Sequence, residues 1–191
     1  MTSLWLIVLI GIKPISAQEI SSNKFFLELE PLQFVNNGWS VVAHYALNDR
    51  WQIGANVFAS ELSEGMNDFV FDIQGDVQFL AKQNVGLNIS PRFFLQQKES
   101  QEGWVVSLPL GWETWTLSDQ NSAEEIDYSF WYLSPRIGYL WYPFSAKRFY
   151  LLGEAVMILP IFRDDATTLS DASVEVNSLI PIPGLGIGLS F

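Results

Sequence analysis

His44 is the only histidine of the chain, and histidine is the side chain best suited to proton transfer near neutral pH. General acid or base catalysis needs a positioned partner, and no residue near His44 in the sequence supplies one. A Ser/His/acid arrangement cannot be recognised elsewhere either. Residue parity places His44 on the polar face of a strand opposite Gly54. We therefore expect it to hydrogen-bond within a barrel, and we predict a protein that is not an enzyme.

Two acidic pairs and a set of glycines are the remaining candidates for a binding site. The acidic pairs at residues 124–125 and 164–165 lack the spaced ligands and the glycine of a calcium loop, so we predict solvated surface there. The alternating glycines of residues 184–188 lie on a strand with no helix after it, which excludes a phosphate loop. Cysteine is absent, which excludes disulfides and cysteine-based zinc sites. No metal and no cofactor are expected.

Two pairs of opposite charges are predicted to meet inside the fold. With a turn at residues 80–84, so that Phe79 pairs with Val85, Asp72 lies directly across from Arg92. Both would then point inward, where an unpaired charge is costly and a hydrogen-bonded pair is tolerable.

The second pair belongs to another predicted hairpin. If Trp141 pairs with Phe149, Arg136 lies opposite Glu154. We predict that both pairs are structural ion pairs that plug the interior.

The strands that must position these residues are visible as alternation. In residues 69–79 and 85–95 the odd positions are mostly large and apolar, and the even positions are mostly polar. A period of two over runs of about eleven residues is typical of a β-hairpin whose strands are long enough to cross a bilayer. The apolar face could point inward, as in a soluble barrel, or outward, as in a membrane barrel.

The rest of the chain has the same character and predicts an all-β antiparallel up-and-down barrel. Turns at 48–50, 81–84 and 143–147 would lie at one end, and residues 104–117 would belong to a long excursion at the other. This arrangement gives eight strands, or ten if 104–117 contains a hairpin near Gly111. Besides the two strands of the 69–95 hairpin, the expected strands are 24–34, 39–47, 51–59, 131–141, 149–160 and 174–191.

Composition favours the membrane barrel. Hydrophobic residues make up 49% of the chain and charged residues only 16%. The net charge of −11 argues against nucleic acid as a partner. Aromatic residues stand near the ends of the strands, where they could form two interfacial girdles. These residues are Trp39, Trp51, Trp104, Trp112, Trp131, Trp141, Tyr142 and Phe149.

The N-terminus predicts a signal peptide. A short apolar run at residues 4–12 precedes a candidate cleavage site after Ala17. We therefore expect a signal peptide at 1–17 and one barrel domain at 18–191.

With its alternating strands, its lack of cysteine and a last strand ending in Phe191, the chain resembles the small OmpA/OmpX-type outer-membrane β-barrel proteins of Gram-negative bacteria. The resemblance implies the outer membrane as location and Phe191 as the C-terminal assembly signal. It also implies outer-membrane lipids and the barrel-insertion machinery as partners, and we expect a monomer. We predict an envelope structural or anchor protein, or a narrow or gated channel. The alternatives are a soluble lipocalin-like binding barrel and an outer-membrane lipid-modifying enzyme.

Overall fold

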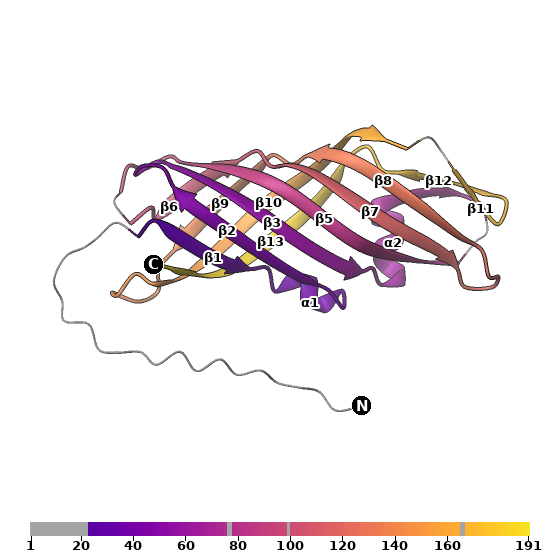
Figure 1. The fold of residues 1–191 in the computed structure, drawn as a ribbon, viewed down its shortest axis with the longest axis horizontal. Coiled ribbons are helices and arrows are strands. Elements are labelled where there is room, and N and C mark those ends of the chain that lie inside the picture. The colour runs from indigo at the N-terminus through magenta and orange to yellow at the C-terminus, as the bar shows by residue number, and fades with distance from the viewer. Residues whose placement is uncertain (1–22, 76–77, 99, 165–166) are drawn as a thin grey trace, which may run out of the picture.

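The computed structural model describes residues 23–75, 78–98, 100–164 and 167–191, so the expected signal peptide at 1–17 lies outside the described residues. Nearly all regular structure in these ranges is strand (Figure 1). The elements are β1 (Phe25–Leu29), α1 (Leu32–Val35), β2 (Trp39–Ala46), β3 (Trp51–Glu61), α2 (Glu64–Val70), β4 (Phe71–Gln74), β5 (Phe79–Phe94), β6 (Gly103–Ser107), β7 (Leu110–Asp119), β8 (Glu125–Leu133), β9 (Arg136–Trp141), β10 (Phe149–Arg163), β11 (Thr167–Leu169), β12 (Ala172–Val176) and β13 (Ile180–Ser190).

The large sheet closes into a barrel of eight antiparallel strands, as predicted. β6 and β7 together form one of the eight, and β9 and β8 form another. Each of these two is interrupted next to a proline, Pro109 or Pro135, which has no N–H to donate to the ladder. The last strand pairs with the first, with Phe26 opposite Ser190, so the barrel sheet has no free edge there.

The predicted turn at 80–84 is wrong, because these residues belong to the continuous 16-residue strand β5. Asn84 is a β-bulge against both neighbouring strands. Before the bulge, odd-numbered residues such as Ala81 face inward; after it, even-numbered residues such as Gly86 and Asn88 do. One extra residue shifts the phase by one position. The apolar residues therefore have odd residue numbers on both sides of the bulge, but they face inward before it and outward after it.

Two further predictions that depended on a turn at 80–84 are also wrong. Residues 104–117 are not an outer excursion, because β6 and most of β7 lie there and complete the barrel. Residues 69–79 are not a barrel strand, since this segment contains the end of α2, the short strand β4 and only the first residue of β5. The predicted number of eight strands is correct, but 69–79 was wrongly included in place of the strand formed by β6 and β7.

The two ends of the barrel differ. The connections from β2 to β3, from β5 to β6 and from β9 to β10 lie at the end where the C-terminus is found. Longer connections lie at the other end and contain α2, β11 and β12 (Figure 1). There β4, β12 and β11 form a separate sheet of three strands, which we call the cap together with α2. The cap joins the β3–β5 connection to the β10–β13 connection.

The interior has three levels. Under the cap, an upper apolar cluster centres on Phe71, whose ring lies 5.5 Å from Trp115 and 6.2 Å from both Phe79 and Tyr128. A lower apolar cluster near the C-terminus includes Phe26, Phe94, Val105, Leu140, Tyr142, Tyr150 and Leu152. Polar and charged side chains lie between the two clusters, and we call this level the polar layer.

The outer surface is apolar around the barrel, which is the reverse of a soluble barrel. Tyr142 is an exception among the expected girdle residues, because its side chain is buried. The exposed apolar belt includes Leu27, Val41, Tyr45, Ile53, Val57, Leu87, Ile89, Leu110, Ile137, Tyr139, Met157, Ile161, Leu185, Ile187 and Leu189, with Trp39, Trp51, Trp104, Trp131 and Trp141. Such a continuous apolar surface is far larger than the patches that soluble monomers expose.

Candidate functional site

The polar layer is the candidate functional site, because it gathers charged side chains that the sequence spreads over more than a hundred residues. Arg92 forms two hydrogen bonds to Glu28, each 3.0 Å long, and both side chains are almost completely buried. The Tyr150 hydroxyl donates to Glu28 Oε2 at 3.1 Å. This geometry is a bidentate guanidinium–carboxylate pair, the strongest common form of side-chain ion pair.

The predicted partner of Arg92 is therefore wrong. Asp72 lies on β4 in the cap, where it is exposed and faces Glu175 of β12 in register. The prediction relied on a turn at 80–84, and the bulged strand β5 replaces that turn. Arg92 instead reaches across the interior from β5 to β1, which are separated by β2 and β3 in the sheet.

Arg136 lies between two carboxylates. Its Nη1 is 3.5 Å from Glu154 Oε2 and 3.6 Å from Glu30 Oε1. The structure thus brings Arg136 and Glu154 together, although the register differs from the predicted one: Trp141 pairs with Leu151. The two charged residues are diagonal neighbours, a separation that a long arginine side chain spans.

Glu113 is the carboxylate of this layer that has no base beside it. Its Oε2 accepts hydrogen bonds from Gln83 Nε2 at 2.8 Å and from Trp115 Nε1 at 3.0 Å. Among the described residues, no arginine, lysine or histidine lies within 4 Å of it. Gln83 in turn accepts from the Ser60 hydroxyl at 3.0 Å, so this part of the layer is held by amide and hydroxyl groups.

His44 lies opposite Gly54, as expected, and points into the interior. Its Nδ1 is 3.4 Å from Arg92 Nη1, and its buried Nε2 has no hydrogen-bond partner among the described residues.

Glycines make room for the large side chains of the interior. A Cβ on Gly54 would come within 2.2 Å of the His44 ring, and a Cβ on Gly188 would come within 2.1 Å of the Tyr150 ring. These close contacts show a tightly filled interior, as is usual for an eight-stranded barrel, which is just wide enough for its own side chains.

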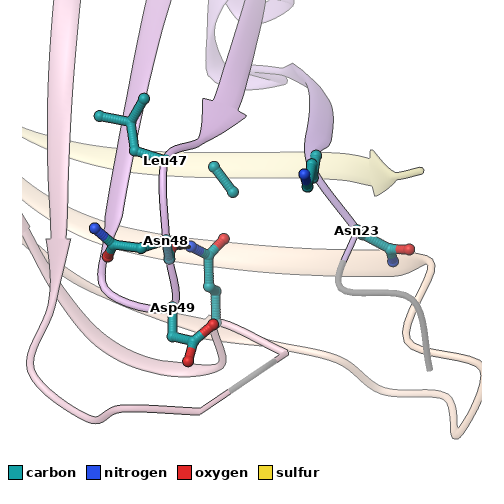
Figure 2. A pocket seen from close by; sticks show the side chains of 7 residues that line it. Asn23, Leu47, Asn48 and Asp49 are labelled. Carbon is teal, nitrogen blue, oxygen red and sulfur yellow. Dashed lines mark hydrogen bonds between the residues drawn. The ribbon is translucent and has the colours of Figure 1, made fainter.

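A small pocket of about 170 Å³ opens next to residues 23–24, beside the turn that joins β2 to β3 (Figure 2). Its polar groups are used by the turn itself. Gln101 Nε2 donates to Asn48 O at 2.6 Å, and Asn48 Oδ1 accepts from the backbone N–H groups of Arg50 and Trp51. This pocket stabilises a turn and offers few free groups to a ligand.

The described residues contain no helix that is both long and apolar enough to cross a membrane. They also contain no group of three or more histidine, cysteine or acidic side chains arranged to hold a metal ion. Of the two acidic pairs, Glu125 accepts a hydrogen bond from Ser118 of β7, and Glu124 accepts one from Ser170 between β11 and β12. Asp164 accepts one from Ser129, and residue 165 lies outside the described residues.

Comparisons with known proteins identify similar structures only. No family model and no curated protein sequence matches the chain. The N-terminal β-barrel domain of Pseudomonas aeruginosa OprF is similar over 88% of this chain and 98% of its own, with 12% identity and a TM-score of 0.45. Ail, the attachment invasion locus protein of Yersinia pestis, is similar over 88% of this chain and 97% of its own, with 13% identity and a TM-score of 0.43. A second Ail structure, in complex with the heparin analogue sucrose octasulfate, has a TM-score of 0.42, with 13% identity over 88% of this chain and 94% of its own.

Proposed function

We propose that this chain is a non-enzymatic outer-membrane barrel that serves as a structural or anchor protein of the envelope, with an interior closed by its own side chains. The observation that carries the proposal is the inverted burial: the outer surface is an apolar belt and the middle of the interior is charged and ion-paired. In water this surface would be exposed at high cost, whereas in lipid it is solvated by acyl chains.

A closed interior is supported at all three levels. The upper apolar cluster lies under the cap, the polar layer is cross-linked by ion pairs, and the lower apolar cluster lies near the C-terminus. A steady aqueous channel would need a continuous polar path, and the two apolar clusters interrupt such a path. The soluble lipocalin-like alternative needs the opposite distribution of polar and apolar faces, with an apolar ligand cavity in the middle of the barrel.

The membrane proposal is tested by placing a charge on the belt. Ile89 is exposed at the middle of the outward face of β5, and Ile89→Arg should destabilise the folded protein in lipid by about 2–4 kcal/mol. The measurement is the free energy of unfolding in phosphatidylcholine vesicles, with the folded fraction monitored by heat-modifiable mobility on gels. Thr116→Arg is the control, because Thr116 faces outward beyond the belt and should cost only about 0–1 kcal/mol there. Equal costs at the two positions, or a wild-type protein that stays soluble without lipid, would refute the proposal.

A further inference from the structure

A groove of about 400 Å³ lies on the outside of the barrel, over β7 and β8. Asn84, on the bulge of β5, borders it from one side, and Asp164, at the end of β10, borders it from the other. Thr114 and Ser129 are opposite each other in register and lie between those borders. The groove is thus formed by four neighbouring strands that the barrel holds in fixed positions.

The groove lies at the upper limit of the apolar belt. On β7 the outward residues change from Leu110 and Trp112 to Thr114, and on β8 they change from Trp131 to Ser129. This border faces the end with the cap, opposite the C-terminus (Figure 1). If the belt lies in lipid, as proposed above, the groove is level with the head groups of the leaflet on the cap side.

Its chemistry is that of a sugar site. Trp112 provides an aromatic surface against which the apolar face of a sugar ring can pack. Two carboxylates can accept hydrogen bonds from hydroxyl groups: Asp127 binds Thr116 through Oδ1, and Asp164 binds Ser129 through Oδ2. The other oxygen of each carboxylate has no hydrogen-bond donor among the described residues. No lysine or arginine is among the residues that line the groove, so it offers no cationic side chain to a bare phosphate.

We propose that this groove binds the uncharged sugar head group of a glycolipid in the leaflet on the cap side. The inference rests on the proposed membrane function, because only that function brings a lipid head group to this height. The apolar belt below would contact the acyl chains, while Trp112, Asp127 and Asp164 would contact the ring and its hydroxyl groups.

The test uses the full-length mature protein reconstituted in vesicles of phosphatidylcholine and monoglucosyl diacylglycerol with matched acyl chains. Native mass spectrometry then measures which lipid stays bound. We expect the wild type to retain the glycolipid preferentially, and the double variant Asp127→Ala/Asp164→Ala to lose about tenfold of that preference, equivalent to ~1.4 kcal/mol. Trp112→Leu keeps the surface apolar and should lower the preference as well.

Controls separate the possible outcomes. Asp68→Ala/Asp72→Ala makes the same change in charge at exposed positions in the cap and should leave the preference unchanged. Failure of the wild type to insert into the vesicles would refute the proposed membrane function. Normal insertion with equal retention of both lipids would refute only the proposed glycolipid site in the groove. The same measurement is repeated in vesicles that also contain phosphorylated lipid A. Retention of lipid A in place of the glucolipid, abolished by a magnesium chelator, would show a cation-bridged phosphate and overturn the assignment. Complete displacement of the bound glycolipid by free methyl glucoside would show that the groove binds soluble sugars equally well, and would overturn the assignment to a lipid head group.

Discussion

Arg92 shows how much of the interior depends on single residues. It donates two hydrogen bonds to Glu28, and Glu28 also accepts one from Tyr150, so removing either charge leaves the other buried without compensation. Arg136 is in a different position, because it is partly exposed and shares two carboxylates at longer distances. The two arginines should therefore differ in their contribution to stability.

Replacing Arg92 by methionine should lower the free energy of unfolding by about 3–5 kcal/mol, the cost of an unpaired buried charge. Glu28→Gln/Arg92→Met should recover most of that loss, because no charge then stays unpaired. Urea unfolding of the four proteins of the cycle in phosphatidylcholine vesicles measures the coupling. Arg136→Met serves as the comparison and should cost less; additive effects at Glu28 and Arg92 would contradict the ion pair.

The sequence predicted one of these contacts and missed the other for a physical reason. Arg136 and Glu154 lie on strands joined by a short turn, so a register error of two residues still left them within reach. Arg92 and Glu28 lie on strands that are not neighbours, and their contact depends on the closure of the barrel. Alternation shows which residues face inward, but it does not show which inward residues meet across the interior.

Among the elements, β5 has the feature that the alternation pattern did not reveal, a β-bulge inside one long strand. Its bulge at Asn84 reverses which face is apolar, so the upper part packs under the cap and the lower part faces outward to the belt. The polar residues around the bulge resemble a turn in the sequence. Gln83 is in fact buried and bonds to Glu113, and Asn84 bonds to Thr116 on the outside.

Deleting Asn84 should therefore be far more harmful than deleting a loop residue. Without the extra residue, either Gln83 and Ala81 or the belt residues below must move to the wrong face. We expect loss of the heat-resistant folded band on unboiled gels after refolding into vesicles. Deletion of Ala123, in the connection between β7 and β8, is the control and should leave that band intact. A folded band at normal yield from the Asn84 deletion would show that the bulge is dispensable.

The closing strand gives a second prediction at this scale. Phe191 N donates to Phe25 O at 2.8 Å, and Lys24 N donates to Phe191 O at 2.9 Å, so the last residue extends the seam between β13 and β1. Deleting Phe191 should slow assembly, because the strands that close the sheet lose these bonds. Phe191→Ala keeps the backbone bonds and adds no charge, so it tests the aromatic ring alone. The folded fraction over time in cells is the measurement, and unchanged assembly of both variants would remove Phe191 as an assembly signal.

At the scale of the whole molecule, the eight-stranded barrel could be predicted because its cause is repeated along the chain. Long alternating strands separated by polar connections occur throughout, and the antiparallel closure follows from them. The cap could not be predicted in the same way. Its strands, β4, β11 and β12, are short, and they are held by the upper apolar cluster and by pairing between two distant connections.

The three levels of the interior lead to a last prediction about conductance. Planar-bilayer recordings of the wild type should show no steady current, since the apolar clusters centred on Phe71 and on Tyr150 interrupt any water path above and below the polar layer. Glu28→Gln/Arg92→Met should stay closed too, because it removes the charges without removing either cluster. Replacing large residues of both clusters, as in Phe71→Ala/Tyr150→Ala, should be needed before brief openings appear. A steady, large wild-type conductance would contradict the closed interior and indicate a water-filled pore.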